Sequence, residues 1–228
     1  MEKFFHRFWV SFLIAGLFFV FCSCKSKTAE ITPPDPLEIT HKVQLVTSKG
    51  DIVLGLYGNG MPVSVTNFVN YVKKGFYDGL IFHRVAKDFV IQGGGFNADM
   101  VQKDTDPPIK LEMPPSETIE EESGRKYKKL LISHDKYALS MARTRIPDSA
   151  TSQFFITLAP TKNLDPNPNY NEPNGYAVFG KVIEGFEVVD EIGSVEVTKK
   201  KGHENVPVED IIIKKAVLLN DLQNNEKQ

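Results

Sequence analysis

One short stretch of the chain gathers side chains that could act together on a substrate. Phe82–Phe96 contains one arginine, Arg84, and one glutamine, Gln92, on either side of a predicted turn at Ala86–Asp88. Alternate residues of a strand share a face, so a turn that preserves this parity places Arg84, Val90 and Gln92 on the same side of two paired strands. The segment therefore presents a cation and an amide to the same space.

A second stretch, Ser152–Ile156, shows the same alternation. It places Gln153 and Phe155 on one face of a predicted strand. We therefore expect an arginine, two glutamine amides and aromatic rings to line one surface that is both apolar and polar.

The body of the chain lacks the residues of several other chemistries. Both cysteines, Cys22 and Cys24, lie near the N-terminus, which excludes thiolate metal sites and cysteine nucleophiles from the rest. His83 could be considered as a base for a serine, but no G-x-S-x-G elbow accompanies it. As the strand neighbour of Arg84 it faces the opposite side, so we expect a core histidine with a backbone partner.

Two further patterns are incomplete ligand motifs. Gly93–Gly95 lacks the third glycine of a phosphate-binding fingerprint, so we expect a bend or a close approach there. Asp165–Asn169 supplies the first three positions of a calcium loop, but Tyr170 replaces the required glycine and Tyr176 the terminal glutamate. We therefore expect neither a metal nor a cofactor.

Short strands and two helices must position these residues. One helix is predicted from Met61–Pro62 to Gly75 and a second over Ile183–Ile192. The predicted strands are the segments around Val43 and Leu45, Ile52–Leu54, Leu80–Val85, Phe89–Gln92, Tyr137–Ala142, Gln153–Leu158, Ala177–Val182 and Ile211–Leu219. Residues 97–136, rich in proline and charge, are expected to form an elaborated loop. This mixture predicts a mainly β fold, a closed barrel with two helices.

Composition narrows the class of protein. The 228 residues are 41% hydrophobic and 25% charged, which excludes a disordered chain, a coiled coil and a polytopic membrane protein. With 27 Lys+Arg against 29 Asp+Glu there is no basic excess, so no nucleic-acid partner is expected. We expect one domain over residues 41–219, a Pro-rich, solvated tether at 25–40 and a polar tail at 220–228.

Residues 1–24 have the pattern of an export signal. Basic Lys3 and Arg7 precede an apolar run, Phe8–Phe21, that is too short for a spanning helix. The polar exit resembles a bacterial lipoprotein processing site, with Cys24 or alternatively Cys22 as the lipidated residue. An uncleaved signal anchor and plain secretion are the alternatives.

Four ordered motifs resemble the cyclophilin family of peptidyl-prolyl cis-trans isomerases. They are Phe82–Phe96, Ala138–Arg143, Ser149–Ile156 and Tyr176–Val182. With the spacing of the elements, the resemblance covers about residues 41–219 and is greatest to bacterial exported cyclophilins. It implies an eight-stranded antiparallel barrel, capped by two helices, with an open surface groove.

The resemblance also implies roles for single residues. Arg84 corresponds to the catalytic arginine, and Gln92 to the glutamine that binds substrate backbone. The other implied groove residues are Phe89, Val90, Phe155 and Leu164 of the proline pocket, Ala142 and Arg143 as main-chain contacts, Gln153 and Tyr176. Lys87-Asp88 replaces the family's usual Pro-Gly turn, and Asn163 stands where many eukaryotic members have a tryptophan.

The sequence thus predicts a monomeric, membrane-anchored lipoprotein, facing the periplasm or the cell exterior, that isomerises X–Pro bonds in client polypeptides. One alternative is a chaperone or binding module that holds Pro-containing segments without catalysis. Another is a structural envelope lipoprotein on an inactive scaffold.

Overall fold

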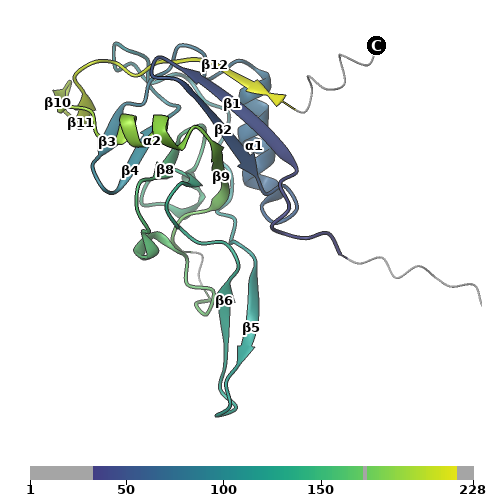
Figure 1. Cartoon of the computed structure of the whole chain (residues 1–228). Helices are drawn as coiled ribbons and strands as arrows, with labels where there is room; N and C mark the ends of the chain where they lie inside the picture. The colour runs from purple at the N-terminus through teal and green to yellow at the C-terminus, as the bar shows by residue number, and fades with distance from the viewer. Residues whose placement is uncertain (1–32, 172–173, 220–228) are drawn as a thin grey trace, which may run out of the picture. The chain divides into compact units, whose positions relative to one another are not determined.

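An eight-stranded antiparallel sheet dominates the computed structural model, which describes residues 33–171 and 174–219 (Figure 1). The chain divides into two units, Met1–Pro33 and Pro34–Gln228, and the sheet lies in the second. The strand order is β12-β1-β2-β9-β7-β8-β4-β3. The prediction of a mainly β fold with eight antiparallel strands is confirmed. The expected signal segment, its Cys22 and Cys24, and the tail at 220–228 lie outside the described residues.

The secondary structure follows the apolar segments of the sequence. The helices are α1 Pro62–Lys73 and α2 Phe186–Gly193, with 3-10 turns at Pro147–Ser149 and Lys162–Leu164. The strands of the main sheet are β1 His41–Thr47, β2 Asp51–Leu56, β3 Arg84–Ala86, β4 Val90–Gly93, β7 Ala138–Met141, β8 Phe154–Thr157, β9 Val178–Glu184 and β12 Ile213–Leu218. Two hairpins are not hydrogen-bonded into this sheet, β5 Ser116–Glu120 with β6 Lys126–Leu130, and β10 Val197–Lys200 with β11 His203–Pro207.

The sheet curls so that its two edges approach each other. The residues just before β3 pair with the residues just before and at the start of β12. Ile81 and Ile212 form an isolated bridge. The Phe82 amide donates to the Ile211 carbonyl at 2.9 Å, and the Ile213 amide to Leu80 at 2.8 Å. These bonds satisfy backbone groups that an open sheet would expose.

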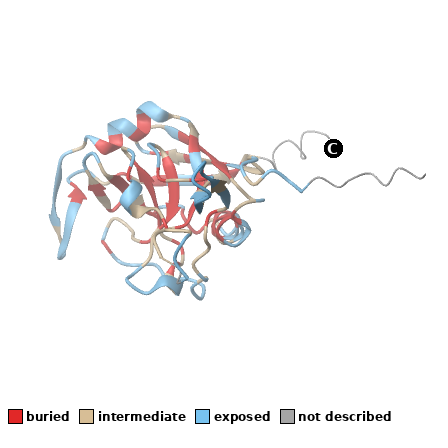
Figure 2. Ribbon diagram, turned by 90° about the horizontal axis from the view of Figure 1, so that it is seen from below, coloured by how far each residue is buried: buried red, intermediate tan, exposed pale blue. Residues whose placement is uncertain are grey.

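Apolar residues line the inside of the sheet and the inner face of α1. Figure 2 shows buried residues along the strands and exposed residues on the outer side of the helices. The ring centroid of Phe68 of α1 lies 5.4 Å from that of Phe154 of β8, edge to face, and 5.2 Å from that of Tyr77. The Tyr77 hydroxyl donates to the Ser152 carbonyl at 2.8 Å, so the buried phenol is satisfied. This aromatic cluster lies behind the strand that carries Phe155.

The N-terminus of α1 is satisfied by a residue far along the chain. Pro62 begins the helix, where a missing N–H costs nothing. Both oxygens of Glu112 accept backbone N–H groups, from Val63 at 3.0 Å and from Ser64 at 2.8 Å. The carboxylate also matches the positive end of the helix dipole. The segment after β4 is therefore fastened to α1.

Two predictions about irregular segments need correction. Residues 97–136 are not only a loop, because they contain the β5–β6 hairpin, which projects from the sheet in Figure 1. Residues 36–40 of the expected solvated tether contact the domain: the Thr40 amide donates to Leu56 at 3.0 Å, and Pro36 lies against Gly60. Backbone hydrogen bonding holds these residues against the domain, and a proline-rich sequence gives no signal of such bonding.

No helix in the described part of the chain is long and apolar enough to cross a membrane.

Candidate active site

A shallow pocket of about 90 Å³ opens on the sheet between β3, β4, β8 and the turn at Lys162–Leu164. Nine of the ten predicted site residues line it: Arg84, Phe89, Val90, Gln92, Ala142, Arg143, Phe155, Leu164 and Tyr176. The tenth, Gln153, is hydrogen-bonded to Gln92. The fold thus brings together side chains that lie 92 positions apart at the extremes, from residue 84 to residue 176. We call this site the proline pocket, after the role that the family resemblance predicts for it.

Arg84 stands at the mouth of the pocket with its charge available. It lies on β3, opposite Gln92 on β4, so both side chains point to the same side as predicted. Its guanidinium carbon lies 5.7 Å from the centre of the Phe89 ring. Within residues 33–171 and 174–219 no carboxylate pairs with Arg84. The cation is therefore partly oriented by an aromatic ring and keeps its donors for a ligand.

The two glutamines form a pair at the edge of the pocket. The Gln92 Nε2 amide donates to Gln153 Oε1 at 3.0 Å. Gly95 makes room for this pair, since a Cβ there would lie 2.6 Å from Cγ of Gln153. Its neighbour Gly94 has φ of +82°. The glycine run is a bend and a close approach, as the sequence predicts.

Aromatic and cationic side chains close the opposite wall. The Tyr176 ring stands edge to face with Phe155 at 5.6 Å. The Arg143 guanidinium lies 4.6 Å from the centre of the same tyrosine ring, and its Nε donates to the Gly175 carbonyl at 2.8 Å. Tyr176 is thereby held between a ring and a cation.

A buried histidine supports the floor of the proline pocket. The His134 ring is fully buried and lies parallel to the Phe155 ring, with centroids 5.8 Å apart and an interplanar angle of 12°. Nδ1 of His134 lies 2.6 Å from Asp165 Oδ1, and Nε2 lies 3.1 Å from the Ser140 hydroxyl. Asp165 directly follows Leu164, so one network touches two walls of the pocket.

The same aspartate is held as a carboxylate. Burial alone raises the pKa of Asp165, but hydrogen bonds from His134 and Ser133 outweigh it and hold the pKa below its usual range. The His134 amide also donates to Asp165 at 2.7 Å. Sequence reasoning missed His134 as part of the site. The signal was a histidine just before the Ala138–Arg143 motif and an aspartate directly after Leu164.

His83, directly before β3, is buried, as predicted, but it does not face away from Arg84, because it lines a neighbouring hollow together with Arg84 and Gln92. Its ring packs 4.7 Å from Phe96. Desolvation, followed by the nearby His203 and Arg84 charges, lowers the pKa of His83 from 6.5 to about 4, against a backbone hydrogen bond to Ile81. The ring is therefore neutral near pH 7 and does not add to the charge of Arg84.

Residues 33–171 and 174–219 contain no cluster of three or more His, Cys, Asp or Glu side chains that could hold a metal ion. The asparagines of the incomplete calcium motif bond elsewhere. Asn169 accepts from the Lys128 amide at 2.9 Å and donates to the Lys128 carbonyl at 3.1 Å. The site thus offers the guanidinium groups of Arg84 and Arg143, two amides and aromatic rings.

The family model, the sequence relatives and the solved structure that match this chain all carry the name of one class of isomerase. A family model described as "Cyclophilin type peptidyl-prolyl cis-trans isomerase/CLD" matches residues 42–218. "Peptidyl-prolyl cis-trans isomerase A" of Dickeya dadantii is 45% identical over 180 residues, which cover 79% of this chain and 85% of the relative. "Peptidyl-prolyl cis-trans isomerase B" of Escherichia coli is 39% identical over 172 residues, covering 75% and 96%. A crystal structure of a cyclophilin-type isomerase from Cryptosporidium parvum superposes with a TM-score of 0.59 at 26% identity, covering 78% of this chain and 96% of the other.

Proposed function

The chain belongs to the cyclophilin-type peptidyl-prolyl cis-trans isomerases, and from this premise we propose that Arg84 supplies its catalytic charge. The protein accelerates rotation about X–Pro bonds and binds proline-containing substrates. In the proposed mechanism, the substrate proline enters the proline pocket against Phe155 and Leu164, while Arg84 donates to the imide as it twists.

The chemistry of the reaction explains why such a site suffices. A planar peptide bond resists rotation by roughly 18–20 kcal/mol because the nitrogen lone pair is delocalised. Twisting returns that lone pair to the proline nitrogen, so a donor aimed at the imide binds the twisted state better than the planar one. No bond breaks, and neither a nucleophile nor a proton shuttle is required. Arg84, which no carboxylate neutralises among the described residues, provides this donor.

A pair of variants tests the role of Arg84. Replacing it with alanine should lower kcat/KM by about 10- to 100-fold, the effect of losing a charge-assisted hydrogen bond of roughly 1.5–3 kcal/mol. Arg84→Lys should recover only part of the rate, because an ammonium lacks the planar fork. Arg125→Ala, at an exposed arginine between β5 and β6, is the control. The rates come from a protease-coupled assay on an Ala-Pro peptide.

The same assay separates catalysis from binding alone. A module that only holds Pro-containing segments needs no cation at the imide, so Arg84→Ala would leave its effect on refolding clients unchanged. Equal rates for the wild type and Arg84→Ala would remove Arg84 from the mechanism and favour the binding module. The half-buried Arg84 guanidinium, which lies beside an aromatic ring and pairs with no carboxylate among the described residues, favours the enzyme mechanism.

The location of the protein forms the second part of the proposal. A basic start, a short apolar run and Cys24 support export and lipid anchoring, with clients that fold outside the cytoplasm. The monomeric state belongs to the same proposal. Mass spectrometry of the mature N-terminus should find a diacylated or triacylated Cys24, and Cys24→Ser should abolish membrane association. A mature chain that retains Met1 would refute processing at this site.

A further inference from the structure

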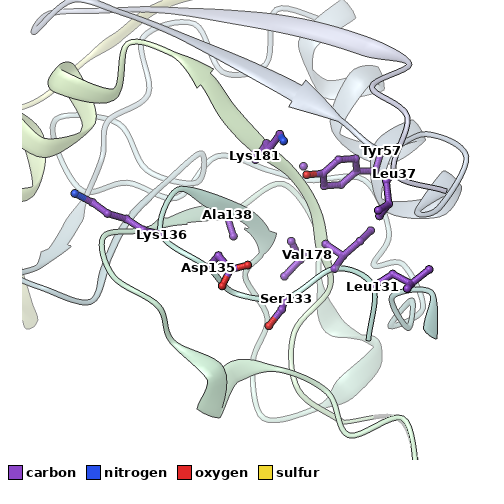
Figure 3. Close-up of a pocket in the computed structure, with 11 residues that line it drawn as sticks. Leu37, Tyr57, Leu131, Ser133, Asp135, Lys136, Ala138, Val178 and Lys181 are labelled. Carbon is purple, nitrogen blue, oxygen red and sulfur yellow. The ribbon is translucent and has the colours of Figure 1, made fainter. Parts of the chain in front are cut away.

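A second and larger cavity, of about 350 Å³, opens between β7, β9 and the chain that follows β6 (Figure 3). Its inner wall is apolar and buried, formed by Ile132, Ala138 and Val178. Leu37 and Leu131, both exposed, stand at its rim. We call it the rear cavity. It shares no residue with the proline pocket.

The polar groups of the rear cavity differ in whether they are already paired. Asp135 forms an ion pair with Lys162 at 2.6 Å, and Lys136 forms one with an aspartate of α2 at 3.0 Å. By contrast, no residue in the described part of the chain bonds to the Tyr57 hydroxyl or pairs with Lys181. In Figure 3 the Tyr57 hydroxyl points toward the other labelled residues, and Lys181 stands beside it on β9 at the edge of the cavity. The groups left available are therefore two donors, a phenol and an ammonium.

The Tyr57 hydroxyl keeps its proton under ordinary conditions. Burial, and second the charge of Asp135, raise the pKa of Tyr57 above its usual value. The phenol is therefore a donor to any acceptor in the cavity. The charge of Asp135 is itself compensated by Lys162. The free groups thus complement an anion attached to an apolar body.

The wall of the rear cavity is also the back of the proline pocket. Ser133, which lines the cavity, donates its hydroxyl to Asp165, and Asp165 is bonded to His134. The next residue, Asp135, accepts from the Thr157 hydroxyl at 2.5 Å through its carbonyl. The segment 133–135 is therefore tied on its far side to β8, which carries Phe155, and to the residue after Leu164.

We propose that the rear cavity binds a small apolar carboxylate and that its occupancy changes isomerase activity through the segment 133–135. The carboxylate accepts from Tyr57 and Lys181, and the apolar body packs against Ile132 and Val178. A ligand that displaces Ser133 moves the Asp165–His134 pair, which supports Phe155. Nothing in this inference depends on Arg84 being the catalytic cation.

Titration with octanoate tests the binding part. Methyl resonances of Ile132 and Val178 should shift first, and Tyr57→Phe combined with Lys181→Gln should weaken binding by about tenfold or more, the loss of a charged hydrogen bond. Octanamide, of the same shape without the charge, should bind weakly. Lys214→Gln, at an exposed lysine of β12 outside the cavity, should bind octanoate like the wild type. Equal affinity for octanoate and octanamide, or first shifts at Leu164 and Val90, would overturn the proposal.

The isomerase assay tests the coupling. Saturating octanoate should change kcat/KM by about fivefold in the wild type, within the usual range of coupling between two sites. His134→Phe keeps a ring beneath Phe155 but removes both side-chain hydrogen bonds, so it should bind octanoate normally and lose this response. An unchanged rate in the saturated wild type, or an unchanged response in a folded His134→Phe variant, contradicts the coupling.

Discussion

The guanidinium of Arg84 lies 5.7 Å from the centre of the Phe89 ring, across the mouth of the proline pocket. Phe89 follows Asp88, which has a positive φ of 55°, in the turn between β3 and β4. The turn therefore fixes the position of the Phe89 ring, and the ring in turn orients the Arg84 guanidinium. This arrangement explains why a charged Lys87-Asp88 turn can replace a Pro-Gly turn without removing the ring from the pocket.

Phe89→Ala should lower kcat/KM by about tenfold, because it removes a pocket wall and a cation–π contact worth roughly 0.5–1 kcal/mol. Phe89→Tyr should retain most of the rate. Stability should change little, since the Phe89 ring is only half-buried. Phe186→Ala, at an exposed ring of α2, provides the control in the same peptide assay. A full rate in Phe89→Ala would show that the turn does not orient Arg84.

Gly94→Ala should destabilise the protein by about 3 kcal/mol, from left-handed backbone and overpacking together. Its φ is +82°, and a Cβ would lie 2.9 Å from ring atoms of both Phe154 and Tyr77. Gly124, with φ of +80° and no atom within 4 Å of its Cβ position, isolates the backbone cost. Gly124→Ala should cost only about 1 kcal/mol. Urea unfolding measures both, and equal losses would mean that the packing contributes nothing.

Ser64→Ala should stabilise the protein by about 1 kcal/mol. The Ser64 hydroxyl is fully buried in α1 and has no hydrogen-bond partner within the described residues, and alanine favours a helix. Ser152→Ala should act in the opposite direction, because the buried Ser152 hydroxyl donates to the Gly94 carbonyl at 2.8 Å. We expect a loss of about 1–2 kcal/mol for Ser152→Ala. Thermal denaturation of the two variants should show opposite shifts, and shifts of the same sign would contradict this account.

His83 should make the protein less stable as the pH falls from about 6.5 to about 4. The unfolded chain takes up a proton near pH 6.5, whereas the folded His83 stays neutral until its pKa of about 4. Acid in this window therefore favours the unfolded state, by up to about 3 kcal/mol. Above pH 6.5 the contribution is fully retained.

His83→Gln removes this titration, so its stability curve should be flatter between pH 4.5 and 7 than that of the wild type. Asp165 does not affect the comparison, because its lowered pKa changes the stability only at pH values near and below the usual pKa of an aspartate. Urea midpoints at several pH values provide the comparison. Parallel curves for the wild type and His83→Gln would mean that His83 titrates normally in the folded protein.

The proline pocket was predictable because most of its residues belong to strands with clear alternation. The parity of Arg84, Val90 and Gln92 follows from a two-residue repeat, and the β3–β4 pairing preserves it. The His134–Asp165 contact could not be derived in this way. It joins residues 31 positions apart, outside the main strands, and no periodic signal links them.

The two added hairpins were missed for a related reason. In β5–β6, Ile119 pairs with Tyr127, and the pairs before and after it are polar. The sequence therefore has no apolar face that would predict a strand. The β10–β11 hairpin is likewise mostly exposed, with only Val206 and Pro207 buried. Binary patterning detects strands that bury one face, and these strands bury almost none.

The bond between Glu112 and the first turn of α1 gives the β5–β6 projection a fixed root. At its base, the Leu131 amide also donates to the Pro115 carbonyl at 2.8 Å, which ties the two stems together. Residues 121–125 at the tip lie beyond these bonds, and also beyond the two bonds that join Lys128 of β6 to Asn169. An engineer could graft a reporter or an affinity peptide onto residues 121–125 and leave catalysis intact.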